Sequence, residues 1–169
     1  MKLAMAMIMV LTLTAYGQQK DAPASPSEQH SEMMKRGDHA MGFSHETTTH
    51  HFRLFKDGGA IEVQANDPAD KASRDEIRTH LSHIAEMFAA GNLNIPMFIH
   101  DTTPPGAPVM EKRHDLIHYK FQETEAGARV RIRTADKAAL DAVHEFLRFQ
   151  IAEHHTGDRT DITNDSAGN

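Results

Sequence analysis

Apolar and polar residues alternate along two pairs of short segments, each pair separated by a glycine-containing turn: residues 50–55 with 60–65, and residues 116–121 with 129–133. Alternation with a period of two is typical of strands that bury one face. Gly58 and Gly59 in the first turn, and Gly127 in the second, can adopt the positive φ values that tight turns require. The pattern therefore predicts two β-hairpins.

An amphipathic helix is predicted after each hairpin, because apolar residues there recur at the helical period. In the first helix Ser73 is the expected N-cap, Glu76 completes a capping box, and Gly91-Asn92 ends the helix. The second helix is expected from Asp136 to about His155. The inward stripes are Ile77, Leu81, Ile84 and Phe88 in the first helix, and Leu140, Val143, Leu147 and Ile151 in the second.

The order strand, strand, helix thus occurs twice, which indicates an internal ββα duplication. Four antiparallel strands with one apolar face need helices to cover that face. We expect an α+β fold: a two-layer sandwich of a four-stranded antiparallel sheet with two helices on one face. The expected organisation is a signal peptide (1–17), a flexible N-terminal linker (18–38), the ββα-ββα domain (39–157) and a disordered tail (158–169).

The first seventeen residues resemble a secretory leader, with a basic start at Lys2, an apolar run over 3–15 and a small-x-small cleavage site at 15–17. The apolar run is too short to span a bilayer as a mature helix. Tyr16 stands where a bacterial lipoprotein leader would carry the lipidated cysteine, so no lipid anchor is expected. The leader predicts a soluble periplasmic or secreted protein without a stable membrane anchor.

Two features of the second half suggest additional packing. The connection over 92–114 contains four prolines, and loops of that length are often functional. The second helix carries Ala142, Phe146 and Phe149 beside its inward stripe, more apolar surface than one core needs. We expect either the proline-rich loop or a second subunit, in a homodimer, to cover this flank.

The amino-acid composition limits which side chains can serve as metal ligands or nucleophiles. The chain has no cysteine, which excludes disulfides, thiolate metal sites and cysteine nucleophiles, but it has 13 histidines and 10 methionines. The formal charge is −6, and loss of Lys2 with the leader makes it −7, so no nucleic-acid partner is expected. Imidazole and thioether are then the softest ligands in an exported chain, and together they favour copper.

The candidate metal ligands fall into three groups. One segment contains His39, Met41, His45, His50 and His51, a helical stripe contains His80, His83 and Met87, and the proline-rich loop contains His100. Residues three and seven positions apart on a helix can converge on one ion. Strand alternation directs His50 inward, on the same face as Phe52, and directs His51 outward. His50, His100 and His144 are then in a position to meet in the interior.

Each group also has a structural interpretation. The methionines can pack the core while the histidines stay solvated, and His144, on the inward face of its helix, is expected to be a hydrogen-bonded core residue. His30, His154 and His155 are expected in solvated ends. The segment 114–118 imitates the His-Glu-x-x-His pattern of zinc proteases, but it precedes and enters a predicted strand, where the two imidazoles would not face one way.

The polar sheet face would carry Arg53, Arg129, Arg131 and Arg133, with Lys120, His51 and His118 nearby. Such a surface is a weak candidate for anion binding. The competing interpretation, which we favour, is a solvated face whose acidic neighbours, Glu62 among them, supply the counter-charges.

Copper binding is therefore the leading functional hypothesis, and two alternatives stay open. Histidine and methionine are also axial ligands of haem, which suggests a non-covalent haem-binding protein. A non-catalytic interaction or pH-sensing module is the other, because protonation of all 13 histidines would turn the charge of −7 into +6. The signatures of serine hydrolases and phosphate-binding loops are absent, so an enzyme is less expected than a binding protein.

Several short motifs between about residues 35 and 158 support a family resemblance: Met41-Gly42-Phe43-Ser44, Thr48-Thr49-His50-His51-Phe52, Pro104-Pro105-Gly106 and His144-Glu145-Phe146-Leu147. With them the chain resembles an uncharacterised family of small exported bacterial proteins, some of whose members carry the label aspartate carbamoyltransferase. The Ser-Thr-Arg-Thr signature of carbamoyltransferases is absent here, and the chain is short for such a two-domain enzyme. The resemblance implies a single exported domain and no mechanism.

Overall fold

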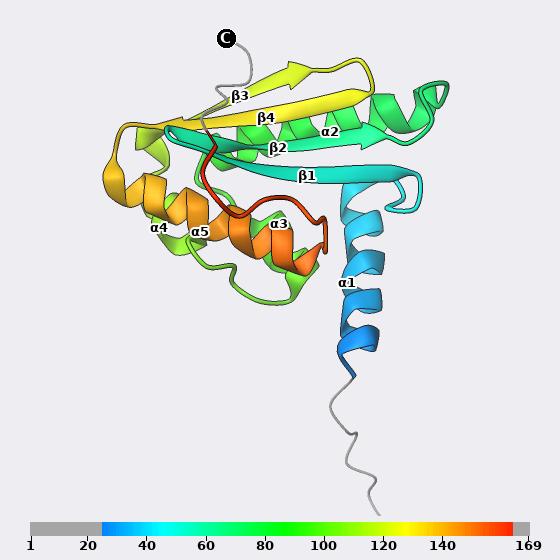
Figure 1. The fold of residues 1–169 in the computed structure, drawn as a ribbon, viewed down its shortest axis with the longest axis horizontal. Helices are drawn as coiled ribbons and strands as arrows, with labels where there is room; N and C mark the ends of the chain where they lie inside the picture. Colours follow the sequence, from blue (N-terminus) through cyan, green and yellow to red (C-terminus); the bar gives the residue numbers. More distant parts are fainter. Residues whose placement is uncertain (1–24, 164–169) are drawn as a thin grey trace, which may run out of the picture.

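Four antiparallel strands form one sheet in the order β1-β2-β4-β3 in the computed structural model, which describes residues 25–163 (Figure 1). The strands are β1 (Thr48–Phe55), β2 (Gly58–Ala65), β3 (Ile117–Glu123) and β4 (Gly127–Thr134). The two hairpins join through β2 and β4, in a register that pairs Ile61 with Val130. Both predicted hairpins are confirmed.

Two long helices follow the hairpins, α2 (Lys71–Ala89) and α5 (Lys137–Glu153). Apart from Leu140, which is only partly buried, their apolar stripes join one face of the sheet in a single buried cluster, in which Ile77 and Leu81 of α2 and Leu147 of α5 are at most 2% exposed. This arrangement confirms the predicted α+β two-layer sandwich. The N-cap of α2 was misplaced: Asp70 caps the helix and accepts from the Ser73 amide at 3.0 Å, so the helix begins two residues earlier than Ser73.

Residues 26–38, predicted as flexible linker, instead belong to helix α1 (Pro26–Met41). The Ser25–Glu28 capping box satisfies its first amides, and Gly42 ends it with φ 84°. Met33 and Met41 give it a buried face. Polar composition misled the prediction because capping and a narrow apolar face are enough to order this segment. Residues 18–24 and the predicted leader lie outside the described residues.

The proline-rich connection contains the short helices α3 (Asn94–His100) and α4 (Ala107–Lys112), and the single turn η1 (His114–Leu116). These pieces cover the extra apolar flank of α5. His100 packs edge-on to Phe149 at 4.9 Å between ring centroids, and Gly106, at φ 81°, lets the chain approach Ala142 so closely that a Cβ there would lie 2.1 Å from the Ala142 oxygen. The loop is therefore a burial partner that the helix pattern predicted.

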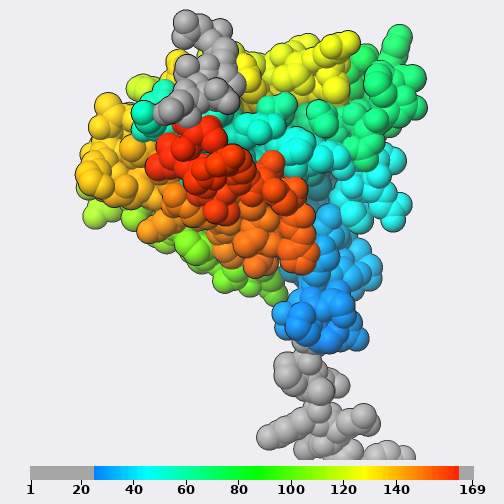
Figure 2. Space-filling view, viewed as in Figure 1, coloured from blue at the N-terminus to red at the C-terminus, as the bar shows by residue number. Residues whose placement is uncertain are grey.

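The tail was also expected to be disordered from residue 158, but residues 158–163 follow the free edge of β1. The Asp158 carboxylate accepts from the Phe52 amide at 2.9 Å, and the Thr163 amide donates to the Leu54 oxygen at 3.0 Å. In the space-filling view this segment covers the surface beside the end of α5 (Figure 2). Residues 164–169 lie outside the described part of the chain.

Candidate functional site

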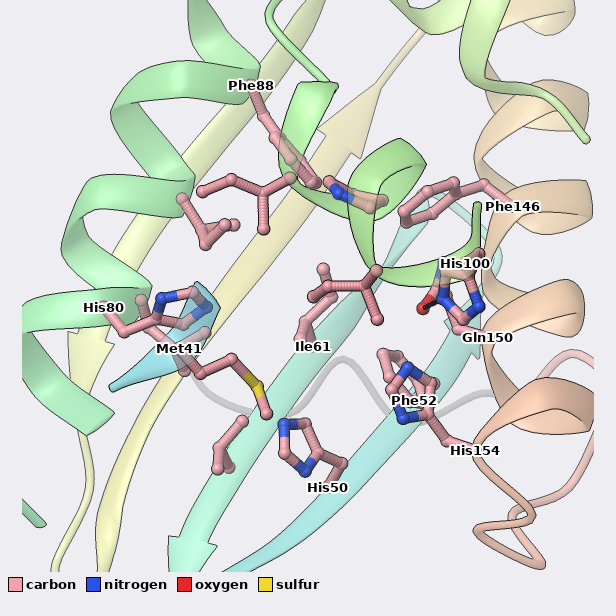
Figure 3. A pocket seen from close by; sticks show the side chains of 16 residues that line it. Met41, His50, Phe52, Ile61, His80, Phe88, His100, Phe146, Gln150 and His154 are labelled. Atoms are coloured by element: carbon pink, nitrogen blue, oxygen red, sulfur yellow. Dashed lines mark hydrogen bonds between the residues drawn. The ribbon is translucent and has the colours of Figure 1, made fainter. Parts of the chain in front are cut away.

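A narrow cavity of about 60 Å³ lies between the sheet and helices α2, α3 and α5 (Figure 3). Most of its lining is apolar, with Phe52 and Ile61 from the sheet and Phe88 and Phe146 from the helices. We call it the inner cavity. Its polar and soft side chains are Met41, His50, His80, His100, Gln150 and His154.

The four imidazoles of the inner cavity come from four separate elements and follow one another across it. The rings of His50 and His154 are stacked with centroids 5.6 Å apart and an interplanar angle of 15°. The ring of His100 stands perpendicular to that of His154 at 5.1 Å. His80 lies at the other end, where Phe43 separates it from His50.

Local structure explains how each of these side chains enters the cavity. His50 alternates with Phe52 and Leu54 on the covered face of β1, as predicted, whereas His51 on the opposite face pairs with Asp158 at 3.0 Å. His100 is the last residue of α3. Met41 is the last residue of α1, and its thioether extends toward the His50 ring (Figure 3).

His154 is the site residue that sequence reasoning placed wrongly, in a solvated end. It follows α5 directly and is seven residues after Leu147, so its side chain continues the buried stripe of that helix by two turns. The signal was present in the same periodicity that identified Leu147 and Ile151. Gln150, one turn before His154, was missed for the same reason.

Of the inner-cavity imidazoles, only His100 has a fully buried ring nitrogen without a hydrogen-bond partner, whereas His50, His80 and His154 are half-buried residues. Among the described residues, the rings of His50, His80 and His154 make no hydrogen bond. His100 shares a hydrogen bond of 3.0 Å between its Nε2 and the Gln150 Oε1, while its Nδ1 has no partner. Four imidazoles therefore line one largely apolar cavity, and most of their ring nitrogens are not bonded to other described residues.

Burial keeps these histidines neutral. It lowers the pKa of His50 and of His80 from 6.5 to about 4, and the pKa of His154 to about 3, with smaller contributions from neighbouring imidazoles. The pKa of His100 is lowered too, chiefly by burial. Near neutral pH each ring therefore offers an unprotonated nitrogen, the form that binds metal ions.

Only part of the predicted ligand set meets here. Met41, His50, His80 and His100 line the inner cavity, whereas His39 and His83 are exposed and Met87 packs against the core outside the lining. His45 and His51 pair with the carboxylates of Asp38 and Asp158. Within residues 25–163, no three side chains drawn from His, Cys, Asp and Glu are arranged to hold a metal ion together.

The remaining histidines have structural positions. The predicted core residue His144 lies apart from the inner cavity, and its Nε2–H is shared between the oxygens of Phe55 and Gly58, at 2.9 and 3.0 Å, which holds the β1–β2 turn. In the zincin-like segment, the His114 Nδ1–H donates to the Ala89 oxygen at 3.0 Å, and His118 is exposed on β3. These two residues are not on one helix, as the protease pattern requires.

The four arginines of the candidate anion surface each have a partner. Arg131 is 2% exposed, stacks on the Phe55 ring at 4.7 Å and pairs with Asp57. Arg133 also approaches Asp57, at 3.4 Å. Arg53 faces Glu62 at 4.0 Å, and Arg129 donates to Gln122 at 2.9 Å. These contacts favour the structural interpretation of the basic face.

Comparisons with known proteins add no function. No family model, curated protein or solved structure matches the chain. Among the described residues, no helix is both long and apolar enough to cross a bilayer.

Proposed function

We propose that the protein binds one Cu(I) ion in the inner cavity through the imidazoles of His50 and His154 and the thioether of Met41. The observation that carries this proposal is the set of half-buried imidazoles that make no hydrogen bond to other described residues, beside a methionine sulfur, in a cavity that no carboxylate lines. Imidazole and thioether suit Cu(I), and its low coordination number is met by three ligands.

The ring separations suit a shared ion. Two imidazoles bound to one ion through metal–nitrogen bonds of about 2 Å have ring centroids roughly 5–6 Å apart. The His50–His154 separation of 5.6 Å falls in this range. Because the two rings are nearly parallel, we expect one of them to rotate about its side-chain torsions when the ion binds.

Charge favours a monovalent ion over a divalent one. The cost of moving an ion from water into an apolar cavity rises with the square of its charge, and neutral ligands do not compensate a second charge. Zn²⁺ sites usually complete a tetrahedron with thiolates, imidazoles or carboxylates, and Mg²⁺ and Ca²⁺ require oxygen ligands. The inner cavity contains neither thiolate nor carboxylate, and among the described residues no three imidazoles are arranged to hold one ion together.

Haem is less favoured by the same cavity. Pockets for drug-sized ligands have volumes of roughly 300–1,000 Å³, whereas the inner cavity has about 60 Å³. A porphyrin would have to separate α3 and α5 from the sheet.

The exported location remains part of the proposal and is supported by residues 1–17 alone.

An anaerobic titration tests this function. The mature protein, residues 18–169, competes for Cu(I) with a chromophoric Cu(I) chelator, and the same preparation is titrated with Zn²⁺. We expect one Cu(I) retained per chain and no stoichiometric Zn²⁺. A His39→Ala/His83→Ala variant, which removes two exposed histidines, is expected to match the wild type. Failure to retain Cu(I), or loss of retention in this control, contradicts the proposal.

A further inference from the structure

A second hollow, of about 620 Å³, opens at the surface between α1, the end of α3 and the end of α5. We call it the outer groove. It is lined by His30 and Arg36 of α1, by His100, and by Glu153 and His155 at the end of α5. Figure 2 shows α1 (blue) and the end of α5 (orange) side by side at the surface.

His100 lines both the outer groove and the inner cavity and therefore forms part of the wall between them. Its side chain is 1% exposed. The Nε2 shares its hydrogen bond with Gln150, but the Nδ1 has no partner and lies 4.0 Å from the Glu153 Oε2, which also lines the groove. A buried ring nitrogen without a hydrogen-bond partner, at the edge of the outer groove, is available to a ligand that enters the groove.

The chain reverses at the end of α5 and separates two consecutive histidines. His155 has φ 51°, in the left-handed region that is uncommon for residues other than glycine. His154 thereby lines the inner cavity, while His155 lines the outer groove and stacks on His30 with centroids 4.4 Å apart. Neither of these two outer rings makes a hydrogen bond within the described part of the chain.

Imidazoles thus line both hollows, with His100 shared between them. The outer pair His30 and His155 is followed by His100 in the wall, then by His154 at 5.1 Å from His100 and by His50 at 5.6 Å from His154. The two steps from His100 to His154 and from His154 to His50 are short enough for one ion to be held by two successive rings during transfer.

We propose that the outer groove is an acquisition site, where Cu(I) first binds to His30 and His155 before His100 passes it to His154 and His50. This inference rests on the proposed function of the inner cavity. The transfer is a ligand exchange: a bond to one ring nitrogen forms as another breaks, and the ion stays Cu(I).

The test separates the rate of loading from its end point. Cu(I) bound to a chromophoric chelator is mixed anaerobically with the wild type or with a His30→Ala/His155→Asn variant, and the loss of chelator absorbance is followed in time. Asparagine tolerates the left-handed backbone at position 155. We expect loading at least tenfold slower in the variant, with a much smaller change in the equilibrium end point.

A His39→Ala variant is the matched control, because His39 is an exposed imidazole on the same helix that does not line the groove. It is expected to load like the wild type. An unchanged loading rate in the His30/His155 variant overturns the acquisition site while leaving the inner site intact. Loss of the end point in that variant also overturns it, since the outer rings would then belong to the final site. Failure of the wild type to load refutes the proposed function itself.

Discussion

Replacement of His154 by phenylalanine is expected to lower the affinity for Cu(I) at least about 100-fold, and at the same time to stabilise the metal-free protein. Loss of a residue that only supports a metal ligand already costs 10–100-fold in affinity, so loss of a ligand is expected to cost at least the upper end. In the metal-free protein, the half-buried imidazole makes no hydrogen bond to other described residues. Its replacement by a phenyl ring therefore breaks no hydrogen bond within the fold and adds apolar burial, which stabilises by about 1 kcal/mol.

The surroundings of His154 can accept the new ring. His50 and Phe52 lie with centroids 5.6 and 5.5 Å from it, distances typical of aromatic pairs. Cu(I) competition and urea denaturation of the metal-free protein measure the two effects. Gain of stability together with loss of affinity is the signature of a residue kept for its ligand.

His144→Phe is the matched control on the same helix. Its imidazole is fully used within the fold, bonded to the oxygens of Phe55 and Gly58. We expect this variant to lose roughly 1–3 kcal/mol of stability, because two buried carbonyls lose their donor. A His154→Phe variant that is destabilised like His144→Phe would show that His154 is structural.

The stability of the metal-free protein is expected to fall as the pH decreases from about 6.5 to about 4. In the unfolded chain a histidine takes up its proton near pH 6.5, whereas the buried His50 and His80 do so only near pH 4 and His154 near pH 3. Over this interval the unfolded state binds more protons, so acid favours unfolding. The contribution of these neutral histidines to the free energy of unfolding is fully present above pH 6.5. Its loss on acidification to about pH 4 amounts to at least about 3 kcal/mol.

Urea denaturation at several pH values between 7 and 4, without metal, measures this slope. His154→Phe is expected to make the slope shallower, and the exposed-residue control His39→Ala is expected to leave it unchanged. A stability that does not vary over this range would mean that the cavity imidazoles are hydrated and titrate normally. A change of oligomeric state with pH in the absence of metal would instead favour the interaction or pH-sensing module.

The periodic parts of this fold could be predicted from the sequence. Alternation defined the hairpins and directed His50 inward, and the helical period identified the buried stripes of α2 and α5. The same reasoning failed at α1, where the Ser25–Glu28 capping box was overlooked because the surrounding composition is polar. Local rules identified this fold wherever burial repeats with a regular period.

The site could be predicted only in part, because nearness in sequence is a poor guide to nearness in space. The histidines of 39–51 are dispersed: His51 points to the opposite sheet face from His50, and His45 is held by Asp38. The partners of His50 come instead from the ends of α3 and α5. Those positions depend on how the proline-rich segment packs beneath α5, which no local pattern specifies.

X-ray absorption at the copper edge of the Cu(I)-loaded protein tests the central claim most directly, since it reports the atoms bound to the ion. We predict two imidazole nitrogens and one sulfur, with the sulfur lost in Met41→Leu and one nitrogen lost in His154→Phe. A shell of oxygen or nitrogen alone in the wild type, or a shell unchanged in both variants, would contradict a Cu(I) site in the inner cavity.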